Sequence, residues 1–306
     1  MPGCRLEGCE FTFQPATLKF VILLLIFLVA CDPRPTAKLV LLGDLMLGRG
    51  VDPKPASLDY LTPELAEADL ELANLESPLS PGSPAAASDY NLCASSDRAN
   101  LLSAWGFDLL SIANNHSFDC GPDGPNDTVK ALTAAGITPV GSGTDPVYRN
   151  VNGLRLAFLA FDDITTPLDA DAAEQAIRSA HEDGAVVIVS IHWGMEYQGG
   201  ASDRQKSLAR RFAEAGAALV WGHHPHVLQP AAWIGDTLIL YSLGNALFDQ
   251  GGLADTRQSA LVLVEVNANG VQSVRAVPFV IDVTDSLLVA PDTETAGYIL
   301  DRIKIK

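Results

Sequence analysis

Carboxylate, amide and imidazole side chains are concentrated directly after the apolar runs of this chain. Of its six histidines, only His181 falls in a segment with the pattern of a surface helix. The other five follow strand-like runs: His116, His192, His223, His224 and His226. Asp44, Asn74, Glu76, Asn114 and Asn115 occupy comparable positions. In α/β sheets ligands collect beyond the carboxyl ends of the strands, so this arrangement predicts a polar site at one edge of a sheet.

The residue types favour a metal site. Imidazole nitrogens with carboxylate oxygens suit zinc, manganese or iron(II), whereas calcium prefers oxygen alone. His224-Pro225-His226 places two imidazoles two residues apart, and on an extended segment both rings point to one side. Gly222 allows close approach of the backbone, and Pro225 stiffens the turn. We therefore expect one or two divalent ions, Mn, Zn or Fe.

The elements that position these residues alternate along the chain. Strands are expected at 38–43, 70–74, 107–112, 154–161, 185–191, 217–221 and 237–242. Helices are expected at 62–68, 97–104, 125–135, 170–182 and 203–215. This alternation predicts an α/β domain with a largely parallel central sheet.

The end of the domain has a different pattern. Residues 259–283 contain an Asn-Gly turn between two alternating segments, which is typical of a β-hairpin. The stretches 77–90 and 249–257 have loop composition. We expect one domain over 38–285, followed by a C-terminal extension over 286–306.

The overall charge bears on partners. The net charge is −17, hydrophobic residues make up 48% and charged residues 19%. Such acidity argues against binding to nucleic acid and against a polybasic membrane patch. The composition is that of a folded protein with a sizeable core.

The N-terminal segment predicts export. An 11-residue apolar run at 20–30 follows Lys19 and ends in Leu28-Val29-Ala30-Cys31. It resembles the lipobox of a bacterial lipoprotein, with a signal peptide at 1–30, lipid on Cys31 and a tether at 31–37. The alternatives are an uncleaved anchor and an ordinary secretory signal. The lipoprotein prediction places the protein outside the cytoplasm, anchored to the cell membrane.

Two cysteines remain in the expected domain, Cys93 and Cys120. An even pair in an oxidising compartment is compatible with a disulfide. The alternative is two buried thiols.

Several ordered segments resemble one family. GDLMLGR, ANLESPL, SIANNHSFDCGPDG, VGSG, SIHWGMEYQ, WGHHPHVLQP and YSLGNALFDQ look like the motif series of the bacterial CapA family, named for capsule and poly-γ-glutamate synthesis. The resemblance covers about residues 38–285. It implies a calcineurin-like metallophosphatase fold: a sandwich of two β-sheets flanked by helices (α-β-β-α), with a dinuclear metal site on the strand-end loops.

The resemblance also implies roles for single residues. It implies His116 as the catalytic histidine and, as metal ligands, Asp44, Glu76, Asn115, His192, His224 and His226. Asn74 accompanies Glu76, and Asn114 lies in the same motif as Asn115. Asn245 and Asp249 belong to the family pattern without an assigned role. For His223 we expect no functional role.

One departure from the metallophosphatase pattern is Met46, which stands where an Asp-x-His motif supplies a histidine. Glu76 also replaces the usual aspartate. One metal position is then weak, differently coordinated or empty, and Met46 should face the gap left by the missing ligand.

Two functions remain open. The first is a metal-dependent hydrolase or transferase acting in capsule or poly-γ-glutamate synthesis or export. The second is a non-catalytic accessory subunit, with a degenerate site, in synthesis or anchoring of the polymer. Both imply the polymer, the membrane and other polymer-synthesis subunits as partners.

Overall fold

The computed structural model describes residues 35–81, 90–141 and 145–305. The expected signal peptide at 1–30 and the expected lipidation site Cys31 lie outside these ranges. In the part of the chain that is described, no helix is long and apolar enough to cross a bilayer.

The first sheet is built around the central strand β1, and its strand order is β18-β17-β16-β1-β2-β5-β6, with β15 also paired to β1. Its strands are β1 (Thr36–Leu45), β2 (Leu70–Leu75), β5 (Leu109–Ser111), β6 (Thr138–Val140), β15 (Asn245–Leu247), β16 (Gln258–Asn267), β17 (Gly270–Asp282) and β18 (Leu287–Val289). The pairs from β1 through β2 and β5 to β6 are parallel, whereas β1, β16, β17 and β18 pair in antiparallel fashion.

The second sheet has the order β12-β13-β10-β9-β8-β7. Its strands are β7 (Val147–Val151), β8 (Leu154–Asp162), β9 (Val186–His192), β10 (Ala217–His223), β12 (Ala232–Ile234) and β13 (Thr237–Leu240). The four inner strands are parallel and the two edge strands antiparallel. Every residue of β9 is buried, as expected for a parallel strand covered on both faces.

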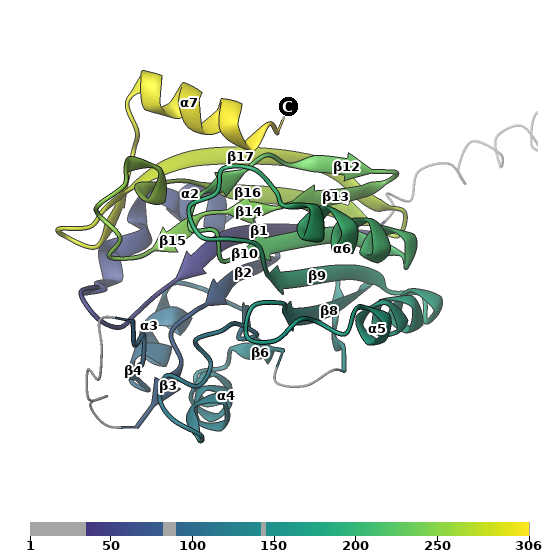
Figure 1. Ribbon diagram of the computed structural model, residues 1–306, viewed down its shortest axis with the longest axis horizontal. Coiled ribbons are helices and arrows are strands. Elements are labelled where there is room, and N and C mark those ends of the chain that lie inside the picture. Colours follow the sequence, from purple (N-terminus) through teal and green to yellow (C-terminus); the bar gives the residue numbers. More distant parts are fainter. Residues whose placement is uncertain (1–34, 82–89, 142–144, 306) are drawn as a thin grey trace, which may run out of the picture. The chain divides into compact units, whose positions relative to one another are not determined.

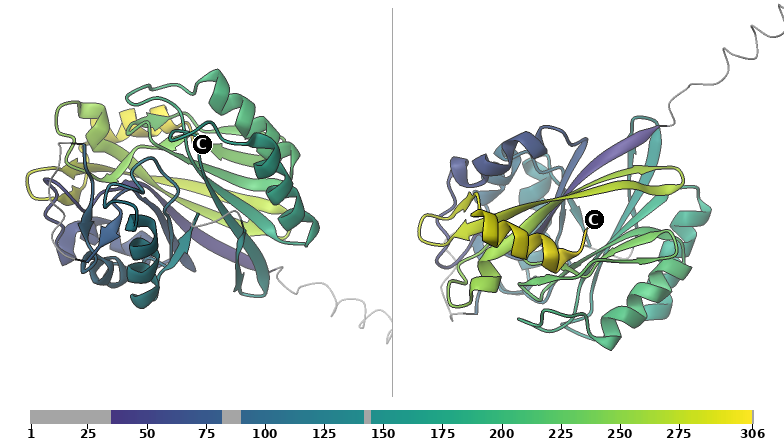
Figure 2. Two further views of the ribbon diagram at one scale, coloured as in Figure 1. Left: turned by 60° about the horizontal axis from the view of Figure 1, so that its bottom comes forward. Right: turned by 90° about the horizontal axis from the view of Figure 1, so that it is seen from above.

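Helices cover the outer face of each sheet (Figures 1 and 2). One group is η1 (Pro55–Leu61), α2 (Thr62–Leu65), α3 (Arg98–Ala104) and α4 (Gly124–Ala134), which pack on the first sheet. The other is α5 (Ala170–Glu182) and α6 (Asp203–Glu214), which pack on the second sheet. Short elements complete the fold: β3 (Leu79–Ser80), β4 (Ala94–Ser95), β11 (Leu228–Gln229), β14 (Ser242–Leu243) and η2 (Ala254–Arg257).

The two sheets share one core. Leu39 and Leu41 of β1 face the second sheet, while Val40 and Leu42 face the helices, because side chains alternate along a strand. Trp221 of β10 donates its indole N–H to the Leu42 carbonyl at 3.0 Å, which links the sheets directly. The predicted fold class, a two-sheet α/β sandwich flanked by helices, is confirmed.

The structure differs from the expected boundaries at both ends. β1 begins at Thr36, within the expected tether. Residues after 285 belong to the same compact unit, Pro35–Lys306, and are not an extension. β18 pairs with β17, and α7 (Thr293–Ile303) buries Ile299 and Ile303 in the inter-sheet core (Figure 1). The expected parallel strands are also divided between two sheets. Each sheet contains antiparallel strands as well, because the chain turns back on itself at their edges.

Candidate metal centre

The parallel strands of both sheets end at the same edge. In the first sheet Asp44 is in register with Asn74, and Asn74 with Ser111. In the second sheet His192 is in register with His223. The sandwich therefore places carboxylate and amide groups of one sheet opposite imidazoles of the other, which is the edge where ligands collect in such folds.

Asp44 is fully buried and is contacted from both sheets. Its Oδ1 accepts a hydrogen bond from Asn74 Nδ2 at 2.9 Å, and its Oδ2 accepts one from the His224 backbone N–H at 3.1 Å. His223 Nδ1 lies 3.3 Å from Oδ1, within ion-pair distance but without hydrogen-bond geometry. Burial alone would raise the pKa of Asp44, but His223 and the other nearby imidazoles outweigh it and hold this pKa below its ordinary value.

Glu76 lies at the centre of the cluster. Its Oε1 is 3.7 Å from His116 Nε2, 3.9 Å from His192 Nε2 and 3.7 Å from His226 Nε2. Both carboxylate oxygens are buried and have no hydrogen-bond partner among the described residues. Burial, and then the negative charge of Asp44, raise the pKa of Glu76 well above its ordinary value. Such burial makes the charged form of Glu76 costly, and a nearby cation would stabilise that form.

Three histidines of the second sheet present nitrogen atoms without partners. Four buried nitrogens make no hydrogen bond within the part of the chain that the structure describes: His192 Nε2, His224 Nδ1 and both ring nitrogens of His223. Burial lowers the pKa of His192 well below its ordinary value and that of His224 to about 4. Burial thus favours the neutral form of His192 and His224, the form in which imidazole binds metals. It also places His223, for which we expected no role, directly beside Asp44.

The segment from His224 to His226 is not extended, contrary to expectation. His224 has φ 92° and His226 has φ 57°, and both lie in the left-handed region. Tyr197 donates its backbone N–H to the Pro225 carbonyl at 2.8 Å, which fixes the turn. Such backbone conformations cost about 1–3 kcal/mol each and are found in clusters at active sites and ligand clamps. Here the turn directs both imidazoles into the cluster.

His226 is oriented by Asn245. Its Nδ1 lies 2.9 Å from Asn245 Oδ1, and the Asn245 amide donates to the Thr256 carbonyl at 2.9 Å and to Gln250 Oε1 at 3.1 Å. Since the amide group is committed to these acceptors, Asn245 Oδ1 accepts from His226 Nδ1–H, and Nε2 remains available toward Glu76. This gives Asn245 a structural role that the sequence did not assign. Burial lowers the pKa of His226.

The two adjacent asparagines differ in their contacts. Asn114 donates to the Leu75 carbonyl at 2.9 Å and accepts from the His116 backbone N–H at 3.1 Å, so its side chain organises the loop. Asn115 Oδ1 is buried without a partner. Asn115 therefore has the oxygen suited to a metal, as the family resemblance implies.

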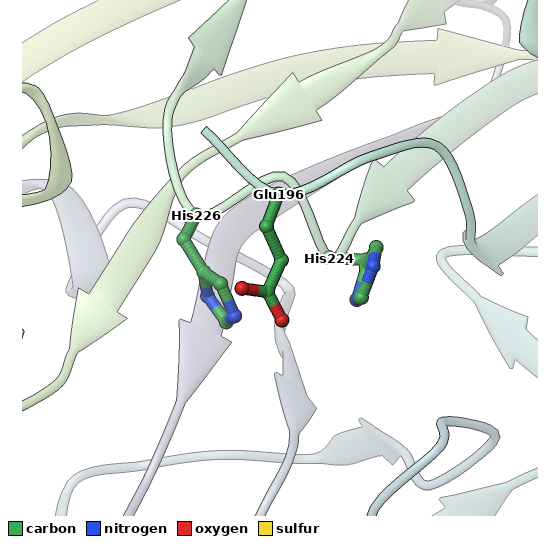
Figure 3. Close-up of side chains that lie close together, drawn as sticks. All are labelled: Glu196, His224 and His226. Atoms are coloured by element: carbon green, nitrogen blue, oxygen red, sulfur yellow. The ribbon is translucent and has the colours of Figure 1, made fainter. Parts of the chain in front are cut away.

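Glu196 is a residue that sequence reasoning missed. In the described ranges, two groups have ligand atoms within 4.8 Å of one another: Glu196 with His224 and His226, and Asp44 with Glu76 and His226. In Figure 3 the Glu196 carboxylate lies between the two imidazoles. Glu196 is exposed and follows no strand directly. The only signal was its place four residues after His192, within HWGMEY.

Met46 and Asp249 lie outside the ligand cluster. Met46 is fully buried in the core beneath the first sheet, and its sulfur accepts from the Gly48 N–H at 3.1 Å. It therefore belongs to the hydrophobic core beside Asp44, and its thioether is engaged by a backbone N–H. Asp249 pairs with Arg49, whose guanidinium lies 5.4 Å from the centre of the Phe248 ring.

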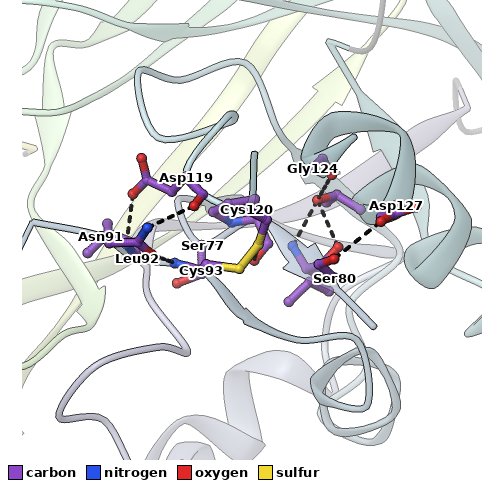
Figure 4. Close-up of a disulfide and its surroundings, with 12 residues drawn as sticks. Ser77, Ser80, Asn91, Leu92, Cys93, Asp119, Cys120, Gly124 and Asp127 are labelled. Carbon is purple, nitrogen blue, oxygen red and sulfur yellow. Dashed lines mark hydrogen bonds between the residues drawn. A yellow bond between two sulfur atoms is a disulfide. The ribbon is translucent and has the colours of Figure 1, made fainter. Parts of the chain in front are cut away.

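Cys93 and Cys120 form a disulfide, with their Cα atoms 5.0 Å apart (Figure 4). The distance is within the ordinary range for a disulfide. The bond joins the segment before β4 to the loop that carries His116.

The donor set fits a divalent ion. Unpartnered buried atoms belong to Glu76, Asn115, His192, His223 and His224. Native proteins leave few such atoms, and a cation beside Glu76 would give a partner to its carboxylate and to the facing Nε2 of His192. Imidazole with carboxylate and amide oxygen is a ligand set for zinc, manganese or iron.

Fold and site together define an α/β sandwich protein with a candidate metal centre between two sheets. The chain belongs to the bacterial capsule synthesis protein family PGA_cap, whose sequence pattern matches residues 38–250. The family predicted from the ordered motifs is thus confirmed.

Two relatives are named for their functions. The PGA biosynthesis protein CapA of Bacillus subtilis is 33% identical over 74% of this chain and 67% of its own. The capsule biosynthesis protein CapA of Bacillus anthracis is 33% identical over 78% of this chain and 66% of its own. The chain thus spans about two thirds of the length of both.

A solved structure shares the fold. A hypothetical protein from Thermus thermophilus aligns with a TM-score of 0.52 and 16% identity, covering 79% of this chain and 98% of that one.

Proposed function

We propose that this protein is a metal-dependent hydrolase or transferase that acts in the synthesis or export of poly-γ-glutamate or another capsule polymer. The observation that carries the proposal is the cluster of buried, unpartnered ligand atoms around Glu76. The functions for which the two Bacillus relatives are named support the polymer. The bond attacked is a phosphoester, or an amide or ester of the exported polymer.

Most of the site residues would bind metal, and one, His116, would transfer a proton. Asp44, Glu76, Asn115, His192, His224 and His226 would hold one or two divalent ions, with Glu196 at the exposed side. A bound ion of this kind lowers the pKa of water and polarises the attacked bond. His116 Nε2 faces Glu76 and the side chain is partly exposed, so this nitrogen is placed to accept a proton from the attacking water and to pass it to a leaving group.

We further propose that the protein acts outside the cytoplasmic membrane and is held there by lipid on Cys31. The support is the sequence Leu28-Val29-Ala30-Cys31 after an apolar run. Mass spectrometry of the membrane-extracted protein should find an acylated Cys31 as the first residue. An unmodified N-terminus elsewhere would refute the anchor.

A non-catalytic accessory role is the second candidate, because Met46 stands in the core where metallophosphatases supply a histidine. Complementation separates the two roles. The test uses a Bacillus subtilis strain that lacks its own CapA. The wild-type chain should restore polymer synthesis, and so should the control variant Glu182→Gln, which changes an exposed residue at the end of α5. Glu76→Gln should not restore it. Restoration by Glu76→Gln would refute the enzyme and favour the accessory subunit.

An assay in vitro addresses the reaction itself. The purified full chain is incubated with a phosphodiester and with poly-γ-glutamate, before and after treatment with a chelator. Turnover that is lost with the chelator and regained with Mn, Zn or Fe is expected. Turnover that persists without metal, or in Glu76→Gln, would contradict the mechanism.

A further inference from the structure

Asp119 lies against the outer nitrogen of His116. Its Oδ2 is 2.8 Å from His116 Nδ1 and also accepts a hydrogen bond from the Leu92 backbone N–H at 2.7 Å. Because this oxygen already acts as an acceptor, the donor in the contact with His116 is Nδ1–H. The contact therefore places a ring proton on Nδ1.

The selected tautomer suits the site. With the proton on Nδ1, the other nitrogen, Nε2, presents its lone pair toward Glu76 Oε1 at 3.7 Å. A carboxylate behind a functional histidine fixes both its tautomer and its ring orientation. Without it, the ring could rotate or place its proton on Nε2.

A disulfide holds this carboxylate in place (Figure 4). Asp119 immediately precedes Cys120, and Leu92 immediately precedes Cys93, so the covalent bond joins the two segments beside the hydrogen bond. Asn91 adds a further link by donating to the Asp119 carbonyl at 2.8 Å. Its Oδ1 accepts from the Cys93 backbone N–H at 2.9 Å, which closes the arrangement.

We propose that Asp119 is a positioning residue for His116, and that the Cys93–Cys120 disulfide is the brace that keeps Asp119 aimed at the ring. The value of the arrangement for catalysis rests on the proposed function, in which His116 handles the proton. The side chains of His116 and Asp119 are partly exposed, 17% and 21%. A packing role in the core therefore does not account for the pair.

The test reads the tautomer of His116 directly. The full chain is labelled with ¹⁵N-histidine, stripped of metal with a chelator and examined by long-range ¹H–¹⁵N NMR. The His116 signal is identified by its absence in His116→Gln. In the wild type the proton should be on Nδ1.

Four variants make the test specific. Asp119→Ala should lose the preference for Nδ1–H, while Asp119→Asn should keep it, because an amide oxygen still accepts from both N–H groups. Cys93→Ser/Cys120→Ser should give a mixture of tautomers with Asp119 intact. Asp123→Asn, an exposed neighbour on the same loop, should behave as wild type. A single Nδ1–H signal in both Asp119→Ala and the double serine variant would overturn the proposal.

Kinetics provide a second readout if the chain is an enzyme. Asp119→Ala should lower kcat by about 10- to 100-fold, as the loss of a histidine's outer partner does elsewhere, with KM nearly unchanged. Because the NMR experiment uses metal-free protein, the two proposals fail separately. An inactive protein with the expected tautomers refutes only the enzyme. An active protein whose His116 tautomer ignores Asp119 refutes only the positioning role.

Discussion

His226 Nδ1 lies 3.5 Å from Asp44 Oδ2, although Asp44 lies in β1 of the first sheet and His226 follows β10 of the second. The other nitrogen of the same ring lies 3.7 Å from Glu76 Oε1. The His226 imidazole, which lies on the loop after β10, thus contacts the buried carboxylates of both Asp44 and Glu76. His226 also belongs to both groups of close ligand atoms, whereas His224 belongs to one.

This relationship predicts an order of metal loss. Loss of the hydrogen-bond partner behind a metal-binding histidine costs up to about 100-fold in metal affinity. His226→Ala removes the imidazole itself, so it should weaken metal binding by about 100-fold or more. His224→Ala should weaken it less, and His181→Ala, an exposed histidine on α5, should not change it. Titration calorimetry and elemental analysis measure the three. Equal metal content in His226→Ala and His181→Ala would contradict the shared role of His226.

Met46 should not be a ligand. Since its side chain is buried in the apolar core, Met46→Leu should leave metal content unchanged and cost less than about 1.5 kcal/mol of stability. Elemental analysis and urea unfolding check both. A loss of bound metal would show that the thioether contributes to the site after all.

Gly222 should tolerate no side chain. A Cβ there would lie 2.2 Å from the Tyr241 carbonyl oxygen and 2.4 Å from Trp193 Nε1, and it would break the hydrogen bond between them. Gly222→Ala should therefore cost about 3 kcal/mol or more. Gly200→Ala, where a Cβ meets nothing within 4 Å, is the matched control and should be nearly neutral. Similar unfolding midpoints for the two variants would refute this account.

Glu71 should make stability depend on pH. Burial, and then Asp108, raise the pKa of Glu71 from 4.5 to about 7. The folded state keeps a proton that the unfolded chain releases, so stability falls as pH rises from 4.5 to about 7. Between pH 5.5 and pH 8, the wild type should lose about 1 kcal/mol more of its unfolding free energy than Glu71→Gln does. This value is discounted for partial exposure. Urea unfolding that gives the same difference in free energy between the two proteins at both pH values would exclude the effect.

The disulfide should also stabilise the fold. It closes a loop with a sequence separation of 27, for which chain entropy gives about 3.5 kcal/mol. Cys93→Ser/Cys120→Ser should lose about this amount in chemical unfolding. An unchanged midpoint would show that the bond is not formed in the folded protein.

Most of the scaffold could be predicted because its signals are local. The runs that became β8, β9 and β10 are continuous and apolar, as parallel strands covered on both faces require. The helices α5 and α6 were placed within a residue by their apolar periodicity. The helix α7 was missed because its burial depends on packing against β11, β16 and β17, which come from distant parts of the chain.

The sequence by itself determined that Asp44, Glu76, His192 and the histidines after β10 end up at strand ends, since parallel strands end on one side of a sheet. Only the tertiary structure decided which atoms meet. The left-handed turns at His224 and His226, the separate duties of Asn114 and Asn115, and the approach of Glu196 depend on backbone angles and on the packing of one sheet against the other. Beyond the last residue of a strand, no periodicity fixes where a side chain points, so contacts between distant segments determine it.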